Sequence, residues 1–462
     1  MSSMLGIVIA LSLLMVLAYR GLSVLLLAPA CALVAVLFSP GTPLMASYTQ
    51  VFMAALGHFL VSYFPLFLLG AVFGKLMEAS GAAHALAHGI VGALGSRHAI
   101  VAVVLACALL TYGGVSLFVV AFAVYPIATA LFRQANTPKR LIPATIALGA
   151  FTFTMTALPG TPSIQNAIPM PYFGTTPFAA PGLGVIGGAV MLGLGLWWLH
   201  RRAAVAKRLD EGYGRHDDVN DAVPAAGPTV PLWQALAPIV AVISLNYALS
   251  SWFWPQAHTG YLADSHYGGT TIQAVRGLWS VIGALVVAIA LLFALHRRRL
   301  PQWQQTLEQG ANASVLPLLN TASQVGFGAV IASLAGFALI REAVLNLAPN
   351  APLVSISVAV NVLAGITGSA SGGMSIALQT LGEVWLGMGK TAGLSPELLH
   401  RVTTIATGGL DALPHNGAVI TLLSLCKLDH KQSYLDIFMV AVAFPLLALV
   451  VVVVLGMSVG SF

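Results

Sequence analysis

An aspartate and a histidine lie four residues apart in an apolar stretch near the carboxyl end of the chain. Asp411 and His415 flank Pro414 within the run 402–425. A charged side chain inside a membrane span costs at least about 2.5–3.5 kcal/mol, which makes such residues candidates for function. Either side chain could carry a proton, and histidine changes its charge close to neutral pH. We therefore expect proton coupling through this pair, unless Asp411 caps a half-helix and His415 packs neutral against backbone carbonyls.

Glycines and short polar side chains mark four interruptions of the apolar runs. Glycine lets a ligand approach the backbone closely, and hydroxyl and amide groups can donate hydrogen bonds to a carboxylate or a hydroxyl group. In the other interpretation, Ser and Thr side chains bond their own backbone or join helices. The candidate ligand-binding residues are Gly113, Gly114, Ser116, Gly160, Thr161, Ser163, Asn166, Ser369, Ser371, Gly372 and Asn416.

The composition excludes a soluble protein. Of 462 residues, 58% are hydrophobic and only 7% are Asp, Glu, Lys or Arg, whereas roughly 25% of an ordinary soluble domain is charged. A spanning helix needs about 20 mostly apolar residues, and runs of that length recur along the chain. The composition and these runs predict a single all-α polytopic membrane protein.

Two apolar runs are too long for one spanning helix and too short for two. The run 99–133 is interrupted by Gly113, Gly114 and Ser116, and the run 353–385 is interrupted at 367–373. Non-helical backbone at membrane depth must be buried in protein or line a watery cavity. Each run is therefore predicted to be a re-entrant helical hairpin.

A broken span follows each predicted hairpin. The span 141–168 is opened by Pro159, Gly160 and Pro162, and the span 402–425 is opened around Pro414. Gly113 precedes Pro159 by 46 residues, and Ser371 precedes Pro414 by 43. The repeated order and spacing indicate an internal duplication, with one repeat in residues 1–199 and the other in 232–462.

The basic residues give the expected orientation. When both hairpins are treated as re-entrant, sixteen of the 20 Lys and Arg residues fall on one face. The other face receives Arg276, Arg341, Lys390 and Arg401. The positive-inside rule places the first face in the cytoplasm, together with a charged linker at 200–231. The two repeats then have inverted topology in a bacterial-type inner membrane.

Several functional classes lack a signal in this sequence. Cys31, Cys107 and Cys426 lie far apart without metal-ligand spacing, so neither a zinc site nor a disulfide framework is expected. We expect no cofactor and no nucleic-acid partner, since the net charge of +6 fits cytoplasmic loops. The expected partners are the lipid bilayer and a small organic anion, and a homodimer is compatible with the sequence. His58 is expected to be a core histidine.

The motifs in their order resemble the gluconate permease family, within the ion transporter superfamily, and most of all its D-3-hydroxybutyrate permease branch. The resemblance covers most of the chain and is best in 113–118, 158–162, 368–371 and 408–417. It implies proton-coupled uptake of small hydroxy-monocarboxylates through two inverted repeats with hairpins. In the gluconate permeases the first broken span resembles Leu-Pro-Pro-His-Pro-Gly-Pro, whereas 160–163 here contains no histidine. This departure favours a smaller, more apolar acid over gluconate.

The predicted function is secondary active transport by alternating access, with a short hydroxycarboxylate bound between the hairpin tips and the broken spans. Half-helix N-termini at such breaks offer free N–H groups to an anion. Sodium coupling of a carboxylate transporter is the alternative, since opened backbone also supplies carbonyl oxygens. A remote alternative from another class is an intramembrane serine hydrolase that uses Ser371 and His415.

Overall fold

The computed structural model describes residues 2–20, 22–214, 230–339, 342 and 351–462, and every regular element in these ranges is helical. Seven helices are long and apolar enough to cross a membrane, or eight when the bent pair Ala82–Leu94 and Ser96–Tyr112 counts as one span. The all-α polytopic fold class predicted from the composition is confirmed. Arg341 and the linker residues 215–229 lie outside the described residues.

The first half of the chain contains one helical hairpin followed by a broken helix. Helices α6 and α7 form the hairpin around a turn at 113–116, and α8 to α11 form the broken helix. The helices of this half are α1 (Ser2–Tyr19), α2 (Val24–Leu37), α3 (Leu44–Ala46), α4 (Met53–Ala79), α5 (Ala82–Leu94), α6 (Ala99–Tyr112), α7 (Leu117–Gln134), α8 (Ile142–Ala150), α9 (Phe153–Thr156), α10 (Ile164–Ala167), α11 (Pro169–Phe173) and α12 (Pro181–Arg208).

The second half has the same order of parts. Helices α18 and α19 form a hairpin, and α20, the short helix η9 and α21 form a broken helix. The described helices of this half are α13 (Leu232–Ala248), α14 (Trp254–Gln256), α15 (Ile272–His296), α16 (Trp303–Ser333), α18 (Pro352–Thr367), α19 (Ala370–Thr391), α20 (Pro396–Thr407), η9 (Leu410–Ala412), α21 (Gly417–Leu425), α22 (His430–Phe438) and α23 (Phe444–Val459).

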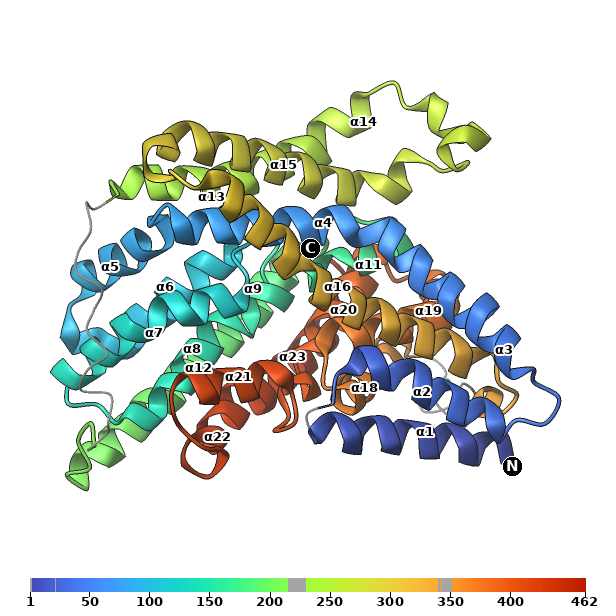
Figure 1. Cartoon of the computed structure of the whole chain (residues 1–462), viewed down its shortest axis with the longest axis horizontal. Helices are drawn as coiled ribbons and strands as arrows, with labels where there is room; N and C mark the ends of the chain where they lie inside the picture. The colour runs from blue at the N-terminus through green and yellow to red at the C-terminus, as the bar shows by residue number, and fades with distance from the viewer. Residues whose placement is uncertain (1, 21, 215–229, 340–341, 343–350) are drawn as a thin grey trace.

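The two halves are packed together along their whole length. Helix α16 lies against both α4 and α19, and α12 lies against α23 (Figure 1). Helices α13 and α15 pair with each other and run along the edge formed by α4 and α5 (Figure 1). The short segments α9, α10 and α11 of the first broken helix contact α20 of the second. The interruptions therefore lie in the interior of the protein, where other helices cover them.

Helix α12 continues through residues that the sequence analysis assigned to a linker. Residues 200–208 are helical, and Tyr213 beyond them is buried. The segment is charged, yet it is rich in Ala, Arg and Lys, which favour helices wherever the chain has left the apolar core. The linker therefore begins later than the predicted boundary at residue 200.

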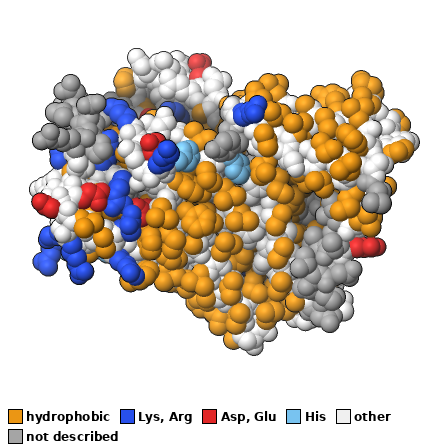
Figure 2. Space-filling view, turned by 90° about the horizontal axis from the view of Figure 1, so that it is seen from below, with side chains coloured by type: hydrophobic (Ala, Val, Ile, Leu, Met, Phe, Trp, Pro, Cys, Tyr) orange, Lys and Arg blue, Asp and Glu red, His pale blue; other side chains and the backbone are white. Residues whose placement is uncertain are grey.

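Ion pairs near the end of α12 connect it to the second half of the chain. Asp436 of α22 is buried and accepts hydrogen bonds from Arg202 Nε at 2.8 Å and Arg140 Nη1 at 3.0 Å. Arg140 also binds Glu211 and lowers the pKa of that carboxyl by hydrogen bonding and charge. Exposed Lys and Arg side chains gather at this end of the molecule (Figure 2). This basic end corresponds to the face expected to be cytoplasmic.

Candidate functional site

The first broken helix is held open by an asparagine whose side chain is fully occupied. Asn166 of α10 is 0% exposed, and its Nδ2 donates to the carbonyls of Thr161 and Pro177 at 3.0 and 2.9 Å. Its Oδ1 accepts from His400 Nε2 at 3.2 Å and from Arg401 Nη1 at 3.4 Å. The sequence predicted a free donor for a ligand, but every hydrogen-bonding group of this amide is engaged by the protein.

Arg401 of α20 is completely buried against the same break. Its guanidinium donates to the carbonyl of Ala179 at 2.7 and 2.9 Å and to the carbonyl of Pro177 at 3.3 Å. A longer hydrogen bond of 3.5 Å reaches the carbonyl of Thr156. None of the ion pairs in the described part of the chain includes Arg401. The first break is therefore lined by a positive charge that backbone oxygens solvate.

The expectation that Arg401 lies just before the start of a span is wrong, because the residue is buried within α20. Ser395 is the N-cap of α20, and its hydroxyl accepts from Leu398 N at 3.2 Å. Pro396 and Glu397 follow in the first turn, so the arginine lies in the second turn. A Ser-Pro-Glu sequence is a helix-start signal. This signal in the sequence indicates that Arg401 and its neighbour His400 lie inside the helix.

The tip of the first hairpin is joined to the first break. The Tyr112 hydroxyl donates to the carbonyl of Pro159 at 2.7 Å. Gly114 has φ of +93°, and a Cβ there would lie 2.9 Å from Cγ of Pro162, so glycine is required at this tight turn. Gly113 packs against Ile239 in the same way. The predicted proximity of this hairpin tip to the first broken helix is therefore observed.

Four other predicted residues of the first repeat lie at the same junction. Ser116 is half-buried at the start of α7, and Ser163 is half-buried and donates to the carbonyl of Met155 at 2.6 Å. Thr161 is buried, and the carbonyl of Gly160 accepts from Asn246 Nδ2 at 3.1 Å. The hydrogen of the Ser163 hydroxyl is taken by Met155, so this hydroxyl can only accept, and the half-buried hydroxyl of Ser116 remains the candidate ligand donor in this repeat.

The second break is joined to the tip of the second hairpin. His415 Nε2 donates to the carbonyl of Gly365 at 3.0 Å, and Asn416 Nδ2 donates to the carbonyl of Gly368 at 2.8 Å. Asn416 Oδ1 accepts from the first N–H groups of α21 and so caps that helix. As with Asn166, the structure gives the Asn416 amide a positioning role, which differs from the ligand-binding role expected from the sequence.

Asp411 lies half-buried in η9, beside His415 on the same break. Among the described residues no Lys or Arg forms an ion pair with it. Side chains of other helices hold the backbone around it: Asn361 Oδ1 accepts from Leu410 N, and the Tyr434 hydroxyl donates to the carbonyl of Ala412. The carboxyl group is thus held in place by its backbone and not by a counter-charge.

Ser369 and Ser371 lie together at the tip of the second hairpin. Ser369 caps α19 by accepting from Gly372 N at 3.1 Å, and its hydroxyl lies 3.5 Å from that of Ser371. The Ser371 hydroxyl also lies 3.3 Å from Thr321 Oγ1 of α16. A hydrolase dyad needs a serine and a histidine within hydrogen-bond reach. The hydrogen bonds of the described residues do not link Ser371 to His415.

The second hairpin fits closely against α16. A Cβ on Gly372 would overlap Oε1 of Gln324, so the carboxamide of Gln324 can take this place only opposite a glycine. Gln324 is 2% exposed, and its Oε1 has no hydrogen-bond partner. Asn320 Oδ1, one turn earlier on α16, and Ser375 Oγ on α19 are also buried and unpartnered. Unpartnered buried polar atoms are rare in native proteins, so this contact region is a candidate ligand site that the sequence analysis found only in part.

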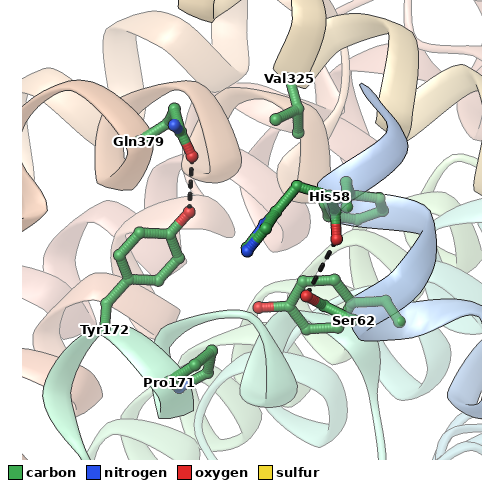
Figure 3. A pocket seen from close by; sticks show the side chains of 8 residues that line it. His58, Ser62, Pro171, Tyr172, Val325 and Gln379 are labelled. Carbon is green, nitrogen blue, oxygen red and sulfur yellow. Dashed lines mark hydrogen bonds between the residues drawn. The ribbon is translucent and has the colours of Figure 1, made fainter. Parts of the chain in front are cut away.

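A pocket of about 310 Å³ opens between α4, α11, α16 and α19. Figure 3 shows His58 of α4 projecting across it toward Tyr172 of α11, with Val325 of α16 and Gln379 of α19 on the far wall. The expectation that His58 is a buried core histidine is wrong, because its side chain is exposed to this pocket. The pocket could not be predicted from the sequence, since its walls come from four separate segments.

The structure brings the predicted residues together in two groups. Each hairpin tip meets the break of its own repeat, and the repeats meet through Asn166, His400 and Arg401. The described hydrogen bonds do not join Ser116 of one tip to Ser371 of the other. A search of the described residues finds no group of three His, Cys, Asp or Glu side chains that could hold a metal ion.

The fold and this arrangement define a class: a polytopic α-helical membrane protein in which each half carries a hairpin and a broken helix. The chain belongs to the family of the uncharacterized transporter YxjC of Bacillus subtilis (strain 168), to which it is 45% identical over 445 residues, 94% of each chain. No protein-family profile matches the sequence.

Two solved transporter structures share the fold at low sequence identity. One is MtrF of Neisseria gonorrhoeae, from a class of antimetabolite efflux pumps, with a TM-score of 0.57, 12% identity and coverage of 99% of this chain and 96% of that one. The other is the YdaH transporter of Alcanivorax borkumensis, described as having an unusual topology, with a TM-score of 0.53, 15% identity and coverage of 99% and 98%. At these identities the likeness concerns the fold alone.

Proposed function

We propose that the protein is a secondary active transporter that couples proton entry to uptake of a small hydroxy-monocarboxylate, 3-hydroxybutyrate-like or gluconate-like, by alternating access. Membership of a transporter family supports the transport activity. The motif resemblance to gluconate permeases supports the substrate class. The inverted orientation of the repeats, an inner-membrane location and a homodimeric assembly belong to the same proposal.

The buried guanidinium of Arg401 at the first break is the observation that supports an anionic substrate. Its acceptors in the described structure are backbone carbonyls and one amide oxygen, so the positive charge of the arginine is not neutralised there. A charge in a low-dielectric interior acts over a longer range than the same charge in water. This field favours an anion near the half-buried hydroxyl of Ser116.

Asp411 and His415 support coupling to protons. Both are half-buried on the second break, and a proton on either one changes the local charge beside the second hairpin tip. His415 holds that tip through the carbonyl of Gly365. Protonation of this pair would therefore change the charge at the contact between the break and the hairpin. Alternating access must rearrange contacts of this kind.

Uptake into proteoliposomes tests the proposal. We expect radiolabelled 3-hydroxybutyrate to accumulate faster with an acidic exterior than without a pH gradient, and a protonophore to abolish the difference. Asp411→Asn and His415→Gln should weaken the dependence on the gradient, with His88→Gln, an exposed histidine on α5, as the control. Uptake that is equal with and without the gradient would contradict proton coupling.

Sodium coupling is the second candidate because of the unpartnered oxygens between α16 and α19. Gln324 Oε1 and Asn320 Oδ1 are acceptors without donors, and carbonyl oxygens are the ligands that hard cations prefer. Replacing sodium with choline at constant pH separates the two candidates. Uptake that falls in choline and ignores the pH gradient favours sodium.

A further inference from the structure

We infer that the pocket between α4, α11, α16 and α19 binds the carboxylate of a small organic anion at His58 and Gln379. The inference rests on the proposed function and gives its substrate a second binding place, apart from the hydroxyl of Ser116 at the first break. The pocket joins both halves of the chain, since α4 and α11 come from the first half and α16 and α19 from the second. A site with walls from both repeats changes shape when the repeats move, as a transport site must.

Two polar groups of the pocket, on Gln379 and His58, have hydrogens left to donate to a ligand. The Tyr172 hydroxyl donates to Gln379 Oε1 at 3.1 Å, which leaves the Gln379 NH₂ group to donate elsewhere. His58 extends its imidazole between Tyr172 and α4 (Figure 3), and at least one ring nitrogen of any histidine carries a hydrogen. None of the residues that line the pocket is acidic. This set of groups favours an anion over a cation.

The remaining walls are apolar and leave room for a small molecule. Phe59, Pro171 and Val325 line the pocket beside the ring of Tyr172. Ligand pockets commonly have volumes of about 300–1,000 Å³, so 310 Å³ is at the small end. A short hydroxy acid has a carboxylate for the donors and a carbon chain for these walls. A highly hydroxylated acid would leave its hydroxyl groups against Phe59 and Val325.

A row of polar residues leads from this pocket toward the second hairpin tip. Ser371, Ser375 and Gln379 are spaced four apart on α19, so they lie on one face of the helix. Ser375 Oγ on α19 and Gln324 Oε1 on α16 are two of the buried atoms that have no hydrogen-bond partner. A ligand hydroxyl passing along this row would supply the missing hydrogen bonds. The row connects the pocket to Ser371 and Ser369, which the sequence predicted as ligand residues.

Cysteine labelling tests binding independently of transport. The three native cysteines are buried, so Ser62→Cys, in the pocket wall one turn from His58, provides one reactive thiol in the full chain. We expect a charged, water-soluble methanethiosulfonate to modify this thiol. We also expect 3-hydroxybutyrate to slow the modification, whereas its uncharged methyl ester should not. Absence of reaction, or equal protection by acid and ester, would overturn the assignment.

Transport by variants provides the second readout. His58→Leu, which removes the donor, should raise KM for 3-hydroxybutyrate roughly tenfold to a hundredfold, the range for a lost hydrogen bond to a charged group. Tyr172→Phe, which removes the hydrogen bond that orients Gln379, should raise KM less. Val325→Trp should fill the pocket and block uptake, and His88→Leu should change nothing. If the unmodified protein transports the acid and His58→Leu keeps its KM, the pocket assignment fails while the proposed function stands. If labelling is protected but nothing is transported, the proposed function fails and the pocket stands.

Discussion

At the scale of single residues, Arg401 places a fully buried positive charge in the interior of the protein. Burying a guanidinium is tolerable only when acceptors surround it, and here the carbonyls of Ala179, Pro177 and Thr156 fill that role. Those carbonyls are free because the chain is non-helical at the first break. Arg401 and the break therefore depend on each other: the opened backbone solvates the charge, and the charge keeps the backbone open.

Replacing Arg401 should damage both stability and transport. Arg401→Met leaves the buried carbonyl of Ala179 without its donors, which costs about 1–3 kcal/mol. Arg401→Lys keeps the charge and loses the planar fork, so we expect intermediate stability and some residual uptake. Thermal unfolding of the detergent-solubilised protein measures the first effect and proteoliposome uptake the second. Arg201→Met, at an exposed position on α12, is the control; a similar fall in that variant would contradict a role specific to the break.

The sequence could predict some site residues and not others for a physical reason. Asp411 and His415 were singled out because ionisable residues within a span stand out by composition alone. The pocket residues His58, Tyr172 and Gln379 were not, since a pocket is made by residues that are distant in sequence and each is ordinary in its own helix. Asn166 and Asn416 were singled out as ligand residues, but their hydrogen bonds to the protein could not be predicted, because tertiary packing sets hydrogen-bond partners.

At the scale of elements, the contact between α16 and the second hairpin is the closest fit in the candidate site. Gly372 allows Gln324 to lie directly against the backbone of α19. The sequence indicated this hairpin, because an apolar run of more than 30 residues with a Gly-Ser centre cannot be one straight span. It could not indicate which helix packs on the hairpin. The extension of α12 beyond residue 200 was not predicted, because the charged residues there were interpreted as a linker. Charged residues outside the apolar core do not end a helix.

Gly372→Ala should separate the second hairpin from α16. The added Cβ would meet Gln324 Oε1, so the variant should lose stability and transport. Gly387→Ala in the same helix is the matched control: its Cβ meets nothing within 4 Å, and alanine in place of glycine within a helix stabilises by roughly 0.5–1 kcal/mol. Shortening the opposing side chain in Gly372→Ala/Gln324→Ala should restore part of the stability. A double variant no better than Gly372→Ala would show that the clash is elsewhere.

At the scale of the whole molecule, the two halves are joined at two junctions, one near the basic end and one deeper in the interior. Asp436 of the second half pairs with Arg140 and Arg202 of the first near the basic end. Deeper in the protein, α9 of the first broken helix lies against α20 of the second. Alternating access requires one of these junctions to move while the protein stays assembled. Asp436 is held by two charged hydrogen bonds of 3.0 and 2.8 Å, whereas Arg401 of α20 reaches Thr156 of α9 only through a hydrogen bond of 3.5 Å. We therefore expect movement at the α9–α20 junction.

A disulfide across that junction should stop transport. A Cβ on Gly408 would lie 3.3 Å from Oγ1 and 3.4 Å from Cγ2 of Thr156, which places cysteines at these two positions within reach of the Cβ separation of about 3.5–4.5 Å in disulfides. We expect Thr156→Cys/Gly408→Cys to lose uptake on mild oxidation and to regain it on reduction, with the cross-linked peptides identified by mass spectrometry. Each single cysteine variant should be insensitive to oxidation.

Ser3→Cys/Ser39→Cys is the matched cross-link, because those hydroxyls lie 3.0 Å apart within the first half, and it should leave uptake unchanged. Full uptake by the oxidised Thr156–Gly408 pair would mean that the two broken helices move as one body, and the moving contact would then have to lie between the hairpins and the breaks.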